Sequence, residues 1–357
     1  MSGLTKWILS TLAVVMSILL LVVYFTSFIN PQELNGLSVV WHTFPYIWII
    51  NALLLILRIF IRNALTFIVQ LASLIVTAPG IHSLCSFIET QDNQRPDIEV
   101  LTYNIRQFKG VDKNSSITAE ELAKFIREQN ADIVCLQEVP TGIYLQTKGK
   151  TATTDIAKEF NYKYACTLDK YKVNSLVILS QYPLHNVSIK PKSLQRRVLM
   201  AEVEVNGKIL NIITCHLQSN SLTDNEINAV SNIHSNNDTR EKEVKSTYDK
   251  LKNAANLRAE QVDELSDFVG KLKHRTIVCG DFNDIPISYT YHTMRHHLED
   301  AFIGSGSGIG NTYNGHLPPI RIDYIFHSDN VKVEKYEELD AEMSDHYPIK
   351  ASIKLLN

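Results

Sequence analysis

The sequence predicts an α/β protein in which membrane-spanning helices precede a layered domain of mixed β-sheets. Two observations lead to this fold class. Up to Ile88 the chain is mostly apolar, whereas from Glu89 onward it has the composition of a water-soluble domain. In that second part, strand-like runs alternate with helical segments, and several neighbouring runs are joined by short turns, so both parallel and antiparallel pairings are expected.

Three apolar segments at the N-terminus are long enough to cross a membrane. Residues 7–29 form an uninterrupted apolar run that spans about 34 Å as a helix, enough for a hydrocarbon core of about 30 Å. A second segment covers 41–61, and a third covers 64–84 with an interruption at Pro79-Gly80. A cleaved signal peptide is the competing interpretation of the first segment, but no small-x-small cleavage site follows it.

The few charges of this part predict its orientation. Lys6 precedes the first segment, Arg58 and Arg62 flank the joint between the second and third, and the 30–40 loop has neither Lys nor Arg. The excess of positive charge in cytoplasmic loops then places the N-terminus in the cytoplasm. With three spans the following domain is extracytoplasmic, and with two it is cytoplasmic. We expect an integral membrane protein with three spans.

The domain that follows is expected over residues 97–357, after a polar linker over 91–96. Residues 1–91 hold three of the 35 basic and two of the 38 acidic residues, which leaves 32 basic and 36 acidic residues in 92–357, a net charge of −4. A protein that grips nucleic acid non-specifically usually carries a basic face, so this balance disfavours a dedicated DNA-binding protein. Four of the five cysteines lie in apolar strand-like runs, and we expect buried thiols.

Turn residues and apolar alternation set the expected elements of this domain. A capping box, Thr118-Ala-Glu-Glu121, predicts a helix that runs to about Gln129. Further helices are expected near 151–161 and 245–272, and a glycine–serine loop over 304–310 is expected at the rim of a site. Strands are expected near 97–104, 132–137, 175–180, 199–205, 208–216, 275–280, 321–327, 331–336 and 348–355.

Six short polar motifs end or open these strands. They supply carboxylates, carboxamides and imidazoles, without a serine or cysteine in a recognisable nucleophile setting. Oxygen ligands are those that Mg²⁺ prefers, and histidines suit the protons and the charge of phosphate-ester hydrolysis. The motifs are Tyr103-Asn-Ile-Arg106, Leu136-Gln-Glu138, Thr214-Cys-His-Leu217, Gly280-Asp-Phe-Asn-Asp284, Arg321-Ile-Asp-Tyr-Ile325 and Ser344-Asp-His346.

The chemistry of these residues suggests roles in catalysis. Asp281 can orient or deprotonate the attacking water, and Asn283 can donate to a phosphate oxygen. His346 can act as an acid or base if Asp323 orients its ring. His216 can donate to the charge that develops in the transition state.

A divalent cation can be held by Glu138, with Asn104 or Asp345 nearby in a mostly aqueous shell. Each candidate also has an ordinary structural explanation. Asn104 suits a turn at a strand end, Glu138 a solvated loop, and His216 a buried structural histidine. Their joint occurrence in this order, each at a strand end, favours the catalytic interpretation.

The ordered motifs resemble the endonuclease/exonuclease/phosphatase family of metal-dependent phosphoesterases over about residues 97–354, most specifically in Gly280-Asp-Phe-Asn283 and Ser344-Asp-His346. The resemblance implies a four-layered α/β sandwich, with two packed β-sheets between helices and the site at one edge. It implies a Mg²⁺ ion, or Mn²⁺ in its place. The segment Ile285–Tyr289 resembles membrane-anchored bacterial members, which implies a bacterial inner membrane.

The resemblance also implies roles for individual residues. Glu138 would be the principal metal ligand with help from Asn104, and Asp345 would complete the metal or water shell. Asp323 would orient His346 as the general base. The aspartate and the asparagine of the Gly-Asp-Phe-Asn motif would position the attacking water and the phosphate.

The substrate class stays open at this point. The sequence around His216 is more like the sphingomyelinase, inositol-phosphatase and pancreatic-type DNase branches than the abasic-DNA branches. Arg106 is a candidate contact to substrate phosphate, and so is either Arg196 or Arg197; surface or packing roles are equally expected for them. A phospholipid head group, another phosphodiester or phosphomonoester, and nucleic acid are all candidate substrates at a membrane. A surface nuclease and a non-catalytic membrane binding module are the alternatives, and no protein partner is inferred.

Overall fold

The computed structural model divides into two compact units that do not follow chain order. The helical unit comprises Met1–Leu84, Asn220–Ala259 and Ile285–His292, and the sandwich unit comprises Cys85–Ser219, Glu260–Asp284 and Thr293–Asn357. The predicted boundary at residues 91–96 stays a prediction. The residues that the structure describes are 3–58, 63–87, 95–111, 116–140, 158, 160–167, 175–188, 191, 194, 197–223, 226, 237–315 and 319–356.

Three helices of the helical unit are long and apolar enough to cross a membrane. The first is α1 (Gly3–Thr26) and the third is α3 (Ala64–Leu84). The second covers Leu37–Arg58 and consists of the 3-10 helix η1 (Leu37–Thr43) followed by α2 (Phe44–Arg58). The expected interruption of the third segment is wrong, because α3 continues through Pro79. In an apolar helix, neighbouring groups satisfy the backbone carbonyl that proline leaves free, so proline is tolerated there.

Polar side chains join the three helices inside their apolar surroundings. Asn51 on α2 donates through Nδ2 to the carbonyl of Met16 (3.1 Å), and Gln70 on α3 donates to the carbonyl of Asn51 (3.0 Å). Ser17 donates to Asn51 Oδ1 at 3.4 Å. Hydrogen bonds of this kind hold apolar helices together where water offers no alternative partner.

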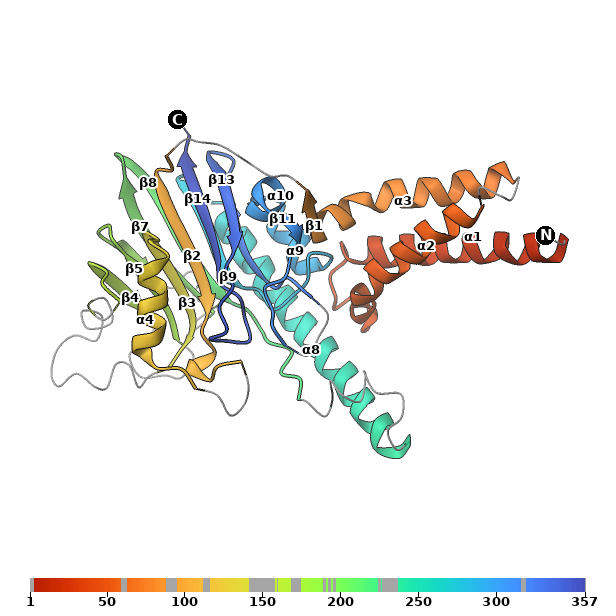
Figure 1. Ribbon diagram of the computed structural model, residues 1–357, viewed down its shortest axis with the longest axis horizontal. Coiled ribbons are helices and arrows are strands. Elements are labelled where there is room, and N and C mark those ends of the chain that lie inside the picture. Colours follow the sequence, from red (N-terminus) through yellow and green to blue (C-terminus); the bar gives the residue numbers. More distant parts are fainter. Residues whose placement is uncertain are drawn as a thin grey trace. The chain divides into compact units, whose positions relative to one another are not determined.

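The sandwich unit contains two mixed six-stranded sheets that face each other, with helices on their outer sides (Figure 1). This confirms the predicted fold class. The first sheet consists, in spatial order, of β13 (Val331–Glu338), β14 (Ile349–Leu355), β2 (Ile98–Asn104), β3 (Ile133–Val139), β5 (Ser175–Ser180) and β4 (Tyr164–Thr167). The second consists of β10 (Glu299–Asp300), β12 (Asp323–His327), β9 (Arg275–Asp281), β8 (Lys208–His216), β7 (Val198–Val205) and β6 (His185–Ser188).

Each sheet has one parallel pair, β2–β3 in the first and β8–β9 in the second, among antiparallel neighbours. The side chains that alternate toward the interior form one core between the sheets, which includes Val100 and Ile133 from the first and Ile212 and Ile277 from the second. The thiols of Cys135, Cys166, Cys215 and Cys279 are free and buried, as predicted.

Helix α4 (Ala119–Glu128) covers the outer face of the first sheet (Figure 1). The predicted capping box is present, since Thr118 accepts from the Glu121 amide and Glu121 accepts from the Thr118 amide. The apolar face of α4, with Leu122 and Ile126, packs on Leu101 and Val134.

Other elements differ from the sequence-based expectation. Helix α8 (Asn237–Val269) begins eight residues before the expected start at Lys245. The expected glycine–serine loop over 304–310 is wrong: it contains the end of α10 (Ala301–Ser305) and strand β11 (Ser307–Ile309), which pairs with β1 (Cys85–Phe87). The expected helix near 151–161 lies almost wholly outside the described residues. Within the described residues, the other short helices are η2 (Arg106–Phe108) and α9 (Tyr289–Met294).

Candidate active site

The two parallel strand pairs bring the candidate residues to one edge of the sandwich unit. Asn104 ends β2, and Glu138 lies one residue before the end of the neighbouring strand β3. His216 ends β8 directly beside Asp281, which ends β9. Because β12 runs antiparallel to β9, its first residue, Asp323, also pairs with Asp281. Strand ends of both sheets therefore meet at a single point.

The Asp281 carboxylate is the centre of this cluster. It is buried, and its Oδ2 accepts a hydrogen bond from Asn104 Nδ2 at 2.9 Å. The same oxygen lies 3.6 Å from His216 Nε2 and 3.8 Å from His346 Nε2. Asp281 Oδ1 accepts from the backbone amide of Asn283 at 2.8 Å. One carboxylate thus contacts four of the residues that the sequence singled out.

The His346 ring is fixed from three directions. Its Nδ1 lies 2.9 Å from Asp323 Oδ2, which leaves Nε2 to face Asp281. Its backbone amide donates to Ser344 Oγ (3.3 Å), and the ring of Tyr313 stands edge-on to the imidazole with the centroids 5.4 Å apart. The structure thus places Asp323 where it can fix the orientation of the ring, and its role in catalysis stays a prediction.

Burial and neighbouring charges shift the pKa values of the three titratable groups of the cluster in different directions. Burial raises the pKa of Asp281 to about 6, although His346 and His216 oppose this. Burial lowers the pKa of His346, but the carboxylates of Asp323 and Asp281 outweigh it and raise that pKa to about 10. Burial lowers the pKa of His216 below its usual value, against the pull of Asp281 and Glu138. At neutral pH the cluster therefore holds an ionised Asp281, a protonated His346 and a neutral His216.

Two neighbouring groups of donors suit a divalent cation. Glu138 is partly exposed, and among the described residues its oxygens have long contacts, 3.4 Å from Asn104 Nδ2, 3.4 Å from Gln107 Nε2 and 3.8 Å from His216 Nε2. Its lone pairs are thus open to an ion. In addition, ligand atoms of Asp281, Asp323 and His346 lie within 4.8 Å of one another. Carboxylate oxygens of this kind fit Mg²⁺ or Mn²⁺.

Asp345 and Arg106 are engaged with each other in the structure. Arg106 Nε lies 3.1 Å from Asp345 Oδ2, and its Nη1 donates to the carbonyls of Gly110 (3.0 Å) and Val111 (2.8 Å). The metal role of Asp345 and the substrate role of Arg106 stay predictions. Each would require this ion pair to open or to be shared.

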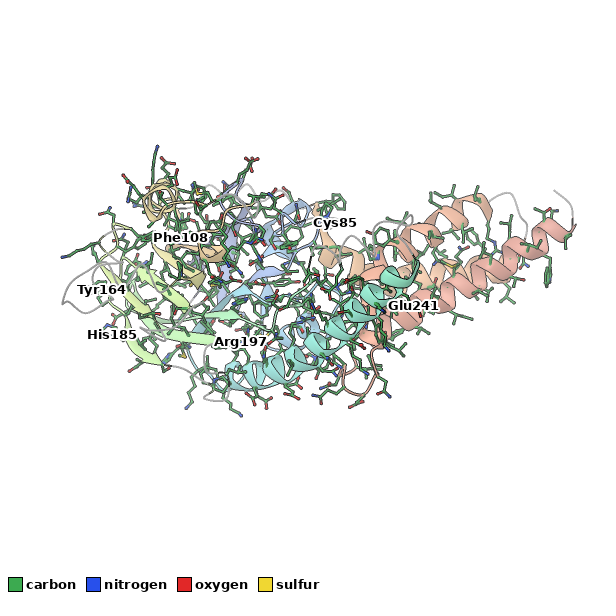
Figure 2. All side chains as sticks on the ribbon, turned by 90° about the horizontal axis from the view of Figure 1, so that it is seen from below. Cys85, Phe108, Tyr164, His185, Arg197 and Glu241 are labelled. Atoms are coloured by element: carbon green, nitrogen blue, oxygen red, sulfur yellow. The ribbon has the colours of Figure 1, made fainter. Side chains whose placement is uncertain are left out.

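Asn283 and Arg197 bind backbone carbonyls at the end of β8. Asn283, with a left-handed φ of 55°, donates through Nδ2 to Leu217 O at 3.2 Å. Arg197 (labelled in Figure 2) donates to the carbonyls of His216 and Leu217, both at 3.3 Å. Arg197 therefore supports the strand that carries His216. The phosphate contact expected of Asn283 stays a prediction.

Several residues at this edge escaped the sequence-based reasoning. Tyr313 pairs with His346 in an isolated β-bridge, and Thr312 Oγ1 accepts from the amides of Ile322 and Asp323, both at 3.0 Å. Gln137 joins the two sheets by donating to Thr102 and Thr214, both at 2.9 Å. Only its place inside the Leu-Gln-Glu motif could have indicated Gln137. No local sequence pattern marks the bridge at Tyr313.

Comparisons with known proteins agree with this geometry. A model of the Endonuclease/Exonuclease/phosphatase family matches residues 101–346. The fold is similar to that of an endonuclease/exonuclease/phosphatase from Beutenbergia cavernae, with a TM-score of 0.50 and 19% identity over 74% of this chain and 72% of that chain.

Two further solved structures share this fold. A family protein from Bacteroides thetaiotaomicron has a TM-score of 0.51 and 13% identity over 73% of this chain and 95% of that chain. The human Nocturnin catalytic domain, solved with a bound sulfate anion, has a TM-score of 0.50 and 17% identity over 75% of this chain and 96% of that chain. At these identities the likeness shows the fold alone. No curated protein sequence matches the chain.

Proposed function

We propose, from the premise that this chain belongs to the endonuclease/exonuclease/phosphatase family and is a phosphoester hydrolase, that it is a membrane-anchored, Mg²⁺-dependent phosphoesterase. Its reaction is the in-line attack of water on a phosphodiester or phosphomonoester. The observation that carries this proposal is the convergence of Asn104, His216 and the Asp323–His346 pair on the single carboxylate of Asp281.

Glu138 and Asn104 are the residues that we propose hold the cation, with Asp345 available if it leaves Arg106. A divalent cation, when bound, polarises the phosphoryl group and offsets the charge that develops on its oxygens. The three-residue group of Asp281, Asp323 and His346 is the alternative position for it, and this position would require His346 to lose a ring proton.

The protonation states of these three groups at neutral pH indicate which group accepts a proton and which groups stabilise charge. Ionised Asp281 orients the attacking water and accepts its proton, since its pKa of about 6 leaves it mostly unprotonated at neutral pH. Protonated His346, held by Asp323, places positive charge beside the reacting phosphoryl group. Neutral His216 donates a hydrogen bond to the negative charge that develops on the phosphoryl oxygens in the transition state. The general-base role that the family resemblance implies for His346 would require this ring to lose its proton.

The substrate that we propose lies at or near a membrane. Three helices that are long and apolar enough to cross a membrane precede the sandwich unit. Residues 92–357 have a net charge of −4. Anchoring favours phosphate esters of the membrane surface, such as phospholipid head groups, over nucleic acid free in solution. The acidic balance supports the same choice, because phosphate neutralisation by basic residues drives non-specific nucleic-acid binding.

Hydrolysis by the full chain in detergent or lipid nanodiscs tests the proposal. The substrates are a chromogenic phosphodiester, a phosphomonoester, sphingomyelin vesicles and plasmid DNA, each with Mg²⁺ and with EDTA. We expect Mg²⁺-dependent turnover that Asp281→Asn lowers about 10²- to 10⁴-fold, the usual contribution of a positioned acid–base group. Asp329→Asn, an exposed aspartate, is the matched control.

The outcomes separate the candidate functions. Turnover of plasmid DNA alone would replace the lipid-side substrate by the surface nuclease. Full activity in EDTA would exclude the metal-dependent mechanism. Absence of turnover on every substrate, in protein that binds Mn²⁺, would favour the non-catalytic binding module.

A further inference from the structure

The eight residues that directly follow the Gly-Asp-Phe-Asn-Asp motif belong to the helical unit, not to the sandwich unit. Within this segment, Ile285–His292, Ile287 is completely buried. It lies in one hydrophobic cluster with residues of all three apolar helices, which are Leu20, Val23, Tyr24, Phe44, Ile47 and Leu74. The chain thus continues from the proposed catalytic loop straight into the packing of the apolar helices.

Specific contacts reinforce this packing at both ends of the segment. Ser83, at the end of α3, donates to the carbonyl of Pro286 at 3.1 Å. His292 Nε2 lies 3.0 Å from Ser27 Oγ. The imidazole of His292 also stacks on the ring of Phe28, with the centroids 3.8 Å apart and the planes 13° from parallel. Ser27 and Phe28 directly follow α1.

The catalytic loop itself is fixed inside the sandwich unit. The amide of Phe282 donates to Ile322 O at 2.9 Å, and the hydroxyl of Tyr324 donates to the carbonyl of Asp284 at 2.7 Å. Only Ile285 separates Asp284 from Pro286. Ile285 therefore links the segment Ile285–His292 directly to the loop that contains Asn283, whose left-handed conformation depends on support from its surroundings.

We propose that Ile287 and Phe28 are positioning residues for the reaction, and that the apolar helices are part of the machinery that holds Asp281 and Asn283 in place. This inference rests on the proposed function of the site. The apolar helices then have a second role besides anchoring. They fix the far end of the loop, and displacement of a catalytic group by about 1 Å can cost about 10²-fold in rate.

Two aromatic residues at the end of α1 provide a matched pair of variants. Phe25 and Phe28 are both about half exposed, at 52% and 45%, and both stand edge-on to Tyr24, at centroid distances of 5.5 and 5.3 Å. Of the two, Phe28 stacks on His292. Phe28→Ala therefore loosens the segment from a position more than 250 residues away in the chain, and Phe25→Ala controls for the loss of an aromatic ring.

The experiment uses the full chain in nanodiscs and two readouts. With a soluble chromogenic phosphodiester, we expect Phe28→Ala and Ile287→Ala to lower kcat about tenfold with KM changed less than twofold, Ile287→Val to restore kcat, and Phe25→Ala to match the wild type. Hydrogen exchange measured by mass spectrometry should quicken in the peptide over 281–284 for the first two variants. It should be unchanged over 344–346.

Each outcome decides the inference. Unchanged exchange over 281–284 in both Phe28→Ala and Ile287→Ala overturns it, and so does an equal loss of kcat in Phe25→Ala, which would indicate general destabilisation. If the wild type hydrolyses nothing, the proposed function fails. The exchange readout still decides whether the apolar helices hold the loop.

Discussion

At the scale of the residue, two adjacent glutamates at the end of β13 have opposite electrostatic environments. Burial raises the pKa of Glu338 to about 7, although its hydrogen bond from the Asn311 amide opposes this. Burial also acts on Glu337, but hydrogen bonds and charges of Lys335 and Lys350 outweigh it and lower that pKa. The two carboxylates should therefore affect stability with opposite signs.

Glu338→Gln should stabilise the protein at alkaline pH. A carboxyl group whose pKa is raised on folding stabilises the folded state fully below its unfolded pKa of about 4.5, and this contribution is lost as the pH rises through about 7. The free energy of unfolding of the variant should exceed that of the wild type by on the order of 1–3 kcal/mol at pH 8.5 and by much less at pH 5. Thermal unfolding at both pH values measures the difference.

Glu337→Gln is the control, and at pH 8.5 it should be less stable than the wild type. Its lowered pKa contributes stability above the unfolded value, which is lost as the pH falls. A Glu338→Gln variant that is destabilised equally at both pH values would contradict the assignment of a buried, costly carboxylate.

Residue types and spacing could indicate the centre of the site, but not its contacts. The motifs placed Asp281, Asp323 and His346 together because each ends or opens a strand, and the structure brings them within 4.8 Å. The ion pair of Arg106 with Asp345 could not be foreseen, since it depends on the left-handed turn at Arg106. A β-bridge such as that of Tyr313 leaves no local signal at all.

At the scale of the element, β8 and β9 approach each other too closely at Gly280 to leave room for a side chain. Gly280, next to Asp281, has a φ of 133°, and a Cβ atom there would lie 2.1 Å from the carbonyl oxygen of Cys215. Both the conformation and the contact exclude a side chain. The parallel pairing that places His216 beside Asp281 therefore requires glycine at position 280.

Gly280→Ala should destabilise the sandwich unit by about 4 kcal/mol or more, because strain at positive φ adds to an overlap with rigid backbone. Gly304→Ala is the matched control: no atom lies within 4 Å of its added Cβ, and its place in α10 favours alanine. Urea unfolding of the two variants compares them. Near-native stability of Gly280→Ala would show that β8 and β9 can separate without cost.

Strong local signals predicted elements well, and weak ones failed. The capping box at Thr118 correctly started α4, because its two reciprocal hydrogen bonds form within one turn. The short strands β4 and β6 were missed, since four residues show too little alternation. The stretch Ser307–Ile309 looked like a loop from its composition, yet it pairs with Cys85–Phe87, a partner more than 200 residues away.

At the scale of the whole molecule, the sequence predicted the layers but not how the chain is shared between units. Alternating strands and helices indicated mixed sheets in a layered domain, the family resemblance implied two packed sheets, and the structure has both features. The assignment of Asn220–Ala259 to the helical unit had no signal in sequence, because this stretch lies deep inside the expected second domain. The segment Ile285–Tyr289 was linked to membrane-anchored family members by resemblance, but its packing partners, such as those of Ile287, could not be read from the sequence.

The sidedness of the sandwich unit is the prediction that belongs to this scale. Lys6 near the start of α1, and Arg58 with Arg62 between the second and third apolar segments, place those points in the cytoplasm by the positive-inside rule. Three spans then carry the C-terminus to the other side. Fused after Asn357, alkaline phosphatase, which is active only outside the cytoplasm, should be active, and green fluorescent protein exported in the same way should be dark.

Fusions truncated after residue 62 provide the control, because two spans return the chain to the cytoplasm. There, alkaline phosphatase should be inactive and green fluorescent protein should be fluorescent. A fluorescent reporter after Asn357 would mean that α3 does not cross, despite its length and apolarity. The site would then face cytoplasmic substrates. An extracytoplasmic result would instead restrict the substrate to phosphate esters of the outer leaflet and the space beyond it, which excludes the inner-leaflet lipids as a class.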